Sequence, residues 1–180
     1  KDIEYYVTNW NNKWIKYGIN LAAPRDPQLF RGKRVLVRRI TSDRIISAFT
    51  DEEIITNALL HIVKPTNQNY AKFLCLLISS KLMKYYFRST TSRDDKVFPE
   101  IKVHELGKFP IKIPKSISDF NKFYDNVHIL VKNKNKNISK LINRASNNLE
   151  IEKLSKKLQS FYNYDFKTFV AELKKKKVKL

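Results

Sequence analysis

The chain has 180 residues, which is enough for one compact domain or for a smaller domain with a helical extension. Hydrophobic residues make up 42% of the sequence, and this excludes a chain that is disordered throughout. The 36 Lys and Arg residues outnumber the 17 Asp and Glu residues and give a net charge of +19. The expected partner is therefore a polyanion, of which nucleic acid is the commonest.

A single cysteine and the absence of a long apolar stretch indicate the cellular setting. Cys75 has no second thiol to pair with, which favours a reduced, cytoplasmic protein in which Cys75 is buried. No signal peptide or membrane-spanning stretch is recognisable, so we expect no membrane partner. The chain opens on Lys1 and its only methionine is Met83, so we interpret it as a segment of a longer protein.

The positive charge is distributed over both halves of the chain. Residues 1–115 contain 21 basic and 11 acidic residues, and residues 116–180 contain 15 and 6. A composition biased towards Lys, Asn and Ile is an alternative explanation, and the stretch HILVKNKNKNISKLIN illustrates it. This bias explains lysine better than arginine, and the arginines are clustered.

The first half of the chain predicts short strands. Residues 5–17 lack a clean period and indicate a loop or a short strand, and residues 24–34 form a connector with two prolines and a glycine. A strand is expected at 35–40, with its hairpin partner at 44–49 and a third strand at 57–63.

The middle of the chain predicts one helix followed by a loop. Apolar residues recur at steps of three and four over 69–87, as on one face of a helix. A basic loop rich in Ser and Thr follows, over Arg88–Lys96. Prolines then divide the chain into short pieces, of which FPIKIP at 109–114 is expected to be an edge strand.

Helical periodicity governs the rest of the chain. Ser116 or Ser118 is the predicted N-cap of an amphipathic helix of roughly eight turns. A second helix is expected around 151–161, and Asp165 is expected to cap a third. The predicted fold class is α+β, with a domain of short strands and a packing helix at 1–115 and a helical extension at 116–180.

One interpretation of the middle loop is a metal-dependent nuclease. Asp94 or Asp95 followed by Glu100 and Lys102 resembles the acidic residues and lysine that such a site places on neighbouring strands around a divalent metal. Only five residues separate Asp95 from Glu100, and Pro99 stands between them, so little room is left for two paired strands. The Glu-x-Lys spacing also arises often by chance in a lysine-rich chain.

Other catalytic and metal patterns are absent from the sequence. His61, His104 and His128 are far apart, and none has the spacing of a metal site. His61 lies in an apolar strand, where we expect a core or edge histidine whose hydrogen bonds are satisfied. The three glycines form no phosphate-binding or dinucleotide-binding motif. We therefore expect no catalytic, cofactor-binding or metal-binding residue in this segment.

Basic and hydroxyl residues predict contact with duplex DNA. One group lies at 31–44 and contains Arg31, Lys33 and Arg34, and the other lies at Arg88–Lys96. Arginine can bind guanine O6 and N7 together, and Ser and Thr suit phosphate oxygens. Strand alternation should place Arg38 and Arg39 on opposite faces. The predicted DNA-binding residues are Arg38, Arg39, Arg44, Arg88, Ser89, Thr90, Thr91, Ser92, Arg93 and Lys96.

A solvated surface is the alternative for these basic groups. In that case the arginines form ordinary salt bridges with the neighbouring acids, which are Asp43, Asp51, Asp94 and Asp95. A third interpretation is a helical protein-interaction module whose basic charge is incidental. That module would assemble along Phe123, Leu130 and Leu141.

The order of the motifs resembles a known family. LFRGKRVLVRRI leads to NALLHIV, then to YAKFLCLLISSKLMKYYF, to TTSRDDKVFPEIKVHELGKFPI and finally to DFKTFVAELKKKK. This order is similar to the TaqI-like C-terminal specificity domain of adenine-N6 DNA methyltransferases and of fused type IIG restriction–modification enzymes. The similarity covers about residues 10–115, and the end of the chain more loosely.

The resemblance implies a target-recognition domain that binds duplex DNA for methyltransferase or nuclease modules lying earlier in the same parent chain. The catalytic Asn/Asp-Pro-Pro-Tyr/Phe tetrapeptide of the family is absent here. S-adenosylmethionine, and Mg²⁺ where the parent also cleaves, would belong to those modules. The resemblance also implies that Glu100 and Lys102 are part of the scaffold of the fold.

Overall fold

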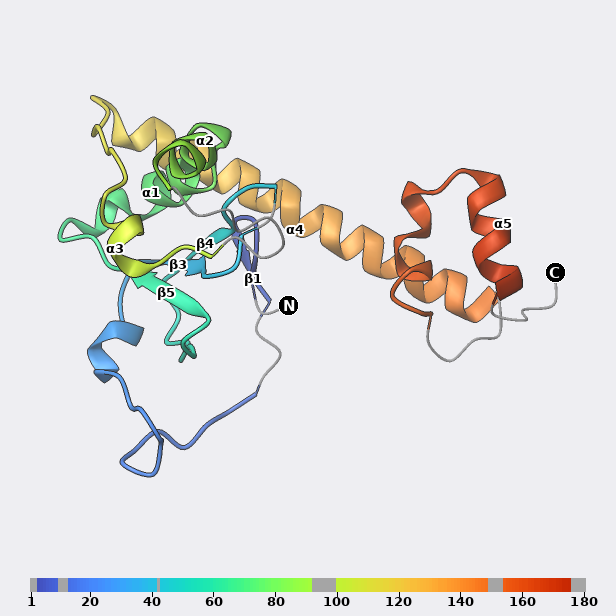
Figure 1. Cartoon of the computed structure of the whole chain (residues 1–180), viewed down its shortest axis with the longest axis horizontal. Coiled ribbons are helices and arrows are strands. Elements are labelled where there is room, and N and C mark those ends of the chain that lie inside the picture. Colours follow the sequence, from blue (N-terminus) through green and yellow to red (C-terminus); the bar gives the residue numbers. More distant parts are fainter. Residues whose placement is uncertain (1–2, 10–12, 42, 92–99, 149–153, 176–180) are drawn as a thin grey trace. The chain divides into compact units, whose positions relative to one another are not determined.

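A computed structural model describes residues 3–9, 13–41, 43–91, 100–148 and 154–175. It contains two small sheets and several helices, so the predicted α+β fold class is confirmed (Figure 1). The chain divides into two compact units, residues 1–131 and residues 132–180. Among the described residues, no helix is both long enough and apolar enough to cross a bilayer.

The main sheet of the first unit has three antiparallel strands in the order β4-β3-β5. Val35 pairs with Phe49 on one side and with Val63 on the other. The three expected strands are therefore present, although shorter than expected. Their bounds are Arg34–Arg38 for β3, Ser47–Thr50 for β4 and Leu60–Val63 for β5.

The two faces of this sheet carry different cores. Val35 and Val37 pack into the larger core, which contains buried residues of the helices that follow. Leu36, between them, packs instead with Ile46 and Ala48 in a second cluster. The period of two along β3 thus gives each face apolar contacts, as expected for a strand covered on both sides.

A small hairpin and two short 3-10 helices complete the β-rich part of the first unit. The hairpin pairs β1 (Ile3–Glu4) with β2 (Val7–Thr8), where the sequence predicted a loop or a short strand. The 3-10 helices are η1 (Pro27–Phe30), before β3, and η2 (Gln68–Tyr70), after β5.

Two helices stand where the sequence predicted one. α1 (Ala71–Ile78) packs over β3 and β4, and α2 (Lys81–Thr90) follows it (Figure 1). The expectation of one helix over 69–87 is wrong, because two serines end one helix and begin the next. The Ser79 hydroxyl is buried and lies 2.6 Å from the Ser47 hydroxyl of β4, and the Ser80 hydroxyl accepts a hydrogen bond from the Met83 N–H.

The expected edge strand at 109–114 is also wrong, since none of these residues is in a strand. A short helix, α3 (Val103–Leu106), precedes this segment, and Phe109 then enters the core. Its ring meets the Tyr86 ring edge-on, with 6.1 Å between the centroids. Pro110 and Pro114 have no N–H to donate to a strand ladder, so burial of Phe109 determines the path of the chain.

The long helix predicted after Ser116 is confirmed. α4 runs Ile117–Asn148, and the Ser116 hydroxyl accepts from the Asp119 N–H at 3.5 Å. Its first turns belong to the core of the first unit, because Tyr124 is buried there. The predicted domain boundary after residue 115 stays a prediction.

α4 also holds the turn of the β1–β2 hairpin. Tyr6 in this turn has φ of 67°, a conformation that costs energy for a residue with a side chain. Its carbonyl accepts hydrogen bonds from the Tyr124 hydroxyl at 2.7 Å and from His128 Nδ1 at 2.9 Å. Burial raises the pKa of the Tyr124 hydroxyl, so this donor keeps its proton.

The second unit is helical and has its own core. It contains the end of α4, the 3-10 helix η3 (Leu158–Asn163) and α5 (Phe166–Lys175). Leu154, Leu158 and Leu173 are its buried residues. Of the expected helix around 151–161, residues 158–161 belong to the 3-10 helix η3 and residues 154–157 are not helical. Residues 149–153 lie outside the described residues. Asp165 caps α5 as predicted, accepting from the Thr168 N–H at 2.7 Å, a bond that lowers the pKa of its carboxyl.

Candidate nucleic-acid interface

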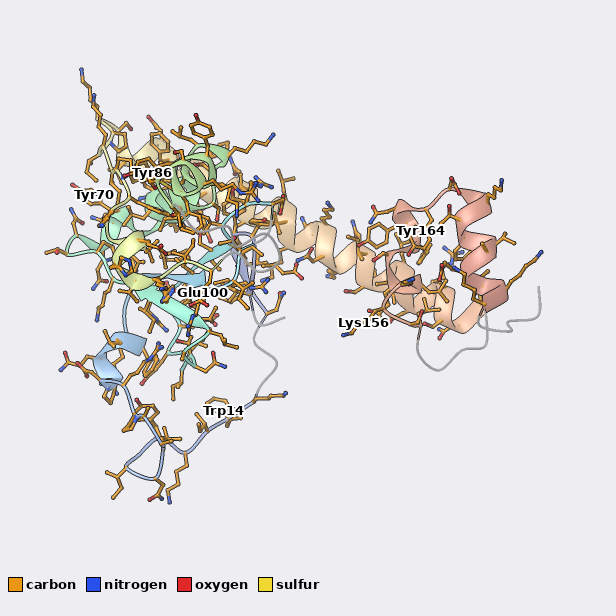
Figure 2. All side chains as sticks on the ribbon, in the orientation of Figure 1. Trp14, Tyr70, Tyr86, Glu100, Lys156 and Tyr164 are labelled. Carbon is orange, nitrogen blue, oxygen red and sulfur yellow. The ribbon has the colours of Figure 1, made fainter. Side chains whose placement is uncertain are left out.

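The end of β3 is joined to the segment that begins at Glu100. Ile40 forms an antiparallel bridge with Glu100, and the Ile101 N–H donates to the Arg39 carbonyl at 2.9 Å. The Arg39 guanidinium forms an ion pair with the Glu100 carboxylate, which lies beside the sheet (Figure 2). His61 of β5 adds a contact at 2.7 Å between Nε2 and the Ile101 carbonyl, so its ring has a hydrogen-bond partner, as expected.

These contacts give Glu100 and Lys102 structural positions. Glu100 is engaged by Arg39, and Lys102 precedes α3, where its N–H donates to Glu105 Oε2 at 2.7 Å. Asp94 and Asp95, the other members of the nuclease hypothesis, lie outside the described residues. Among the residues that the structure describes, no group of three or more His, Cys, Asp or Glu is placed to hold a metal ion.

The turn between β3 and β4 is held by the Tyr5 side chain of the β1–β2 hairpin. The Arg38 N–H donates to the Ile46 carbonyl at 2.9 Å and closes the turn. The Arg44 guanidinium lies 4.7 Å from the centre of the Tyr5 ring, and the Tyr5 hydroxyl donates to Asp43 Oδ1 at 2.7 Å. Arg44 is thus oriented by an aromatic face and by the adjacent carboxylate rather than left to rotate freely.

The first half of α2 contacts this same turn. Lys84 is only 5% exposed, and its Nζ donates to the Thr41 hydroxyl at 2.7 Å. Burial lowers the pKa of Lys84, the positive charge of Arg88 lowers it further, and Asp43 opposes both effects. Arg88 itself is exposed, one helical turn beyond Lys84.

The structure therefore brings together two segments that are about forty residues apart in the sequence. The Lys84–Thr41 hydrogen bond links the β3–β4 turn to the first half of α2, and Arg88 lies one helical turn further along the same helix. Among the described residues, five cations lie on these two segments, with Asp43 and Glu100 as the neighbouring acids. The five do not share one face, because Lys84 is buried and Arg38 and Arg39 project from opposite faces at the end of β3. We call the five cations the cationic end of the sheet; they are Arg38, Arg39, Arg44, Lys84 and Arg88.

Arg38 and Arg39 are separated as the alternation predicted. Arg38 is in register with Leu60 of β5, and its side chain follows Leu36 on the second face of the sheet. Arg39 points towards Glu100 instead. The two guanidinium groups therefore lie on opposite faces of the sheet.

Ser89 and Thr90 are helical rather than in a loop. Arg88, Ser89 and Thr90 form the last turn of α2, which corrects the expected loop start. The Ser89 and Thr90 hydroxyls donate to the Tyr86 carbonyl at 3.0 and 2.8 Å. To donate to a phosphate, either hydroxyl would have to break its hydrogen bond to the Tyr86 carbonyl. Thr91 follows the helix, and Ser92, Arg93 and Lys96 lie outside the described residues.

Three residues of the 31–44 group do not join the cationic end. Arg31 forms an ion pair with Glu53 at 3.2 Å, and it lies beyond the start of β3. Arg34 is fully buried and donates to the backbone carbonyls of Gly32, Glu52 and Ile54, so the expectation that it contributes to a basic surface is wrong. Lys33 is exposed near Arg31, at the same distant end of the strand.

Lys84 is the functional candidate that the sequence did not indicate. Its position among apolar residues of a helix marks it as a packing residue, and its partner Thr41 is 43 residues away. The available signal is the spacing of Lys84 and Arg88, which are four residues apart and therefore share a helix face.

The cations of the cationic end suit phosphate groups, and the one thiol of the chain is unreactive. Cys75 is fully buried, and burial raises the pKa of its thiol to about 12, so it is no nucleophile at neutral pH. Arginine and lysine side chains on one surface suit the sugar–phosphate backbone. The geometry therefore favours binding over catalysis.

Residues 1–111 match the family described as the TaqI-like C-terminal specificity domain. The chain belongs to this family. The match covers the main sheet, α1, α2 and the cationic end. A TaqI-like specificity domain indicates a DNA-recognition role in restriction–modification enzymes. Residues 114–180 match a second family, described as a domain of unknown function (DUF8810). No match was found among curated proteins.

Proposed function

We propose that this chain is the DNA target-recognition segment of a larger adenine-specific DNA methyltransferase or fused type IIG restriction–modification enzyme. The observation that carries the proposal is the Lys84–Thr41 hydrogen bond within a TaqI-like domain, because it joins the β3–β4 turn, which carries Arg44, to α2, which carries Arg88. Duplex DNA is the polyanion that such a domain would bind.

Each part of the cationic end has a role in this proposal. Arg88, exposed at the end of α2, contacts a phosphate, and Arg38 and Arg44 approach the groove from the turn. Arg39 and Lys84 act mainly as positioning residues, since one is paired with Glu100 and the other is buried against Thr41. Ser92, Arg93 and Lys96 lie outside the described residues and stay predicted DNA contacts.

The chemistry is assigned to other modules of the parent chain. The sequence contains neither the catalytic tetrapeptide of adenine methyltransferases nor a glycine motif for S-adenosylmethionine. Those modules would bind S-adenosylmethionine, and Mg²⁺ where the parent also cleaves. The role of this segment is to grip the duplex, read its sequence and hold the target adenine where the methyltransferase module can reach it.

Fluorescence anisotropy with duplex DNA over a series of salt concentrations tests the proposal. Binding should weaken steeply as salt rises, because each neutralised phosphate contributes about 0.9 to the slope of log K against log salt. Arg88→Gln should lower that slope by about 1. The matched control is Arg31→Gln, which removes the same charge at the far end of β3 and should leave affinity and slope unchanged.

Selection of binding sites from a randomised duplex pool tests sequence reading separately. The unaltered chain should enrich a defined sequence, and Arg38→Gln should relax the preference at one or more positions. Binding that is insensitive to salt, or a pool that stays random after selection, would refute target recognition by this chain.

A further inference from the structure

The second unit carries a regular line of positive charges along α4. Lys132, Lys136, Lys140 and Arg144 follow one another at four-residue intervals, and all four are exposed. Each step of four residues advances about 6 Å along the helix and turns it by only about 40°, so the four side chains form one inclined ridge about 18 Å long. We call these four residues the α4 row.

The α4 row lies opposite the face that packs into the unit. Ile142 and Ala145 contact the cluster formed by Leu154, Leu158 and Leu173. At about 100° per residue, these two positions point to the other side of the helix from the α4 row. The core of the second unit therefore directs the row towards solvent.

The α4 row is unfavourable for the helix itself. Like charges four residues apart destabilise a helix by about 0.2–0.5 kcal/mol per pair. No Asp or Glu occurs anywhere between Lys132 and Asn148 to offset this repulsion. A bound anion would offset the repulsion between these four positive charges.

The surrounding charges leave the second unit strongly cationic. Residues 132–180 contain 14 basic and 4 acidic residues. The two acids that lie in the described part of this unit are both used within it: Asp165 caps α5, and Glu172 accepts from Lys175 Nζ at 2.7 Å. Asn133, Asn143 and Asn147 flank the α4 row and add amide donors suited to phosphate oxygens.

The apolar surface of this unit does not suit a membrane. A helix that binds a lipid surface needs an exposed apolar face beside its cations. Among the described residues of the second unit, Leu141 and Tyr162 are the large hydrophobic residues that are exposed, at 47% and 43%. The apolar residues Phe169 and Leu173 of α5 face the core instead.

We propose that the α4 row binds the phosphate backbone of duplex DNA without regard to sequence. This inference rests on the proposed function, because DNA bound by the first unit would also be available to the second unit of the same chain. One strand of DNA carries a phosphate for about every 3.4 Å of axis, so a ridge of this length spans about five base pairs. The second unit would add affinity, and the first would supply the sequence preference.

A charge-neutral row variant of the full chain tests the inference. It combines Lys132→Gln, Lys136→Gln, Lys140→Gln and Arg144→Gln. With a random-sequence duplex, the slope of log K against log salt should fall by about 3–4. Circular dichroism should show unchanged or slightly increased helix content, because four like charges have been removed from α4.

The matched control removes the same charge from the second unit away from the α4 row. It combines Lys134→Gln, Lys156→Gln, Lys157→Gln and Lys174→Gln, all at exposed positions. Its slope should fall by less than half as much as that of the row variant. Equal losses in the two variants would show a diffuse charge effect and would overturn the inference, as would competition by polyglutamate as strong as competition by DNA.

The two proposals fail in different ways. If the row variant keeps the slope of the unaltered chain while that chain still selects a defined site, the α4 row inference is wrong and target recognition stands. If the randomised pool shows no enrichment but the row variant still loses slope, target recognition is wrong, and the α4 row remains a sequence-independent DNA contact.

Discussion

Lys84 links the two segments that carry the cationic end. It is almost completely removed from solvent, yet its hydrogen-bond partner is a neutral hydroxyl, that of Thr41. Burying a charge beside a neutral partner is costly, and the lowered pKa of Lys84 reflects this cost. The fold retains it, which fits the positioning role proposed for Lys84 at the β3–β4 turn.

Replacing this lysine with methionine should stabilise the fold and weaken DNA binding. Lys84→Met keeps a flexible apolar stem and removes the charge. The lowered pKa means that the folded chain holds the proton less tightly than the unfolded chain. The cost is present at pH values below the lowered pKa, and it disappears as pH rises to about 10.4, the ordinary lysine value. The melting temperature of Lys84→Met should therefore exceed that of the unaltered chain at pH 7, by a margin that narrows towards pH 10.

Lys81→Met is the control for this comparison, because it makes the same change at an exposed position of α2. Its melting temperature should follow that of the unaltered chain at both pH values. A Lys84→Met chain that melts below the unaltered chain at pH 7 would show that Lys84 stabilises the fold while charged.

The break between α1 and α2 shows how a pair of serines divides an apolar stripe. Ser79 ends α1 with its hydroxyl buried against Ser47, and Ser80 begins α2 as its N-cap. The break redirects α2, so Met83 and Phe87 enter the core while Arg88 stays at the surface. The position of the cationic end therefore depends on this cap.

Removal of the Ser80 cap should destabilise the first unit. Ser80→Ala leaves the Met83 N–H without its side-chain partner, and the expected loss is about 1 kcal/mol of unfolding free energy. Urea denaturation followed by circular dichroism measures it. Ser89→Ala is the matched control within α2, since its exposed hydroxyl only donates back to the Tyr86 carbonyl. A loss for Ser80→Ala no larger than that of the control would contradict the capping role.

The elements that the sequence predicted are those with a strong local signal. The three strands carry β-branched and apolar residues between turn residues, and Ser116 and Asp165 precede clear helical stripes. The break at Ser79 was missed because its cause is a contact with Ser47, 32 residues earlier. The expected strand at 109–114 failed for the same reason, since Phe109 is held by rings of α2 rather than by a neighbouring strand. The burial of Arg34 and Lys84 likewise depends on partners distant in the sequence.

At the scale of the whole chain, the two units have separate cores. The first unit is built around the sheet and α1, and the second around Leu154, Leu158 and Leu173. None of these three leucines is a member of the clusters in the first unit. Each core can therefore be weakened by a change that leaves the other intact.

Hydrogen exchange followed by mass spectrometry tests this separation. Leu158→Ala should speed amide exchange in residues 154–175, because such a truncation costs about 2–5 kcal/mol of stability. Protection of α1 and β3 should not change. The reciprocal variant, Ile78→Ala, should speed exchange in α1 and spare α5. Loss of protection in both units from either variant would show that they unfold as one.

The burial of Cys75 makes the chain convenient to label. This thiol is the sole cysteine of the sequence, and its raised pKa keeps it protonated and slow towards maleimides. A new cysteine placed at an exposed position, such as Ser89 in α2 or Asn133 in α4, would then take a fluorophore alone. The native thiol can stay in place, so each unit can be given its own optical reporter of DNA contact without disturbing the core.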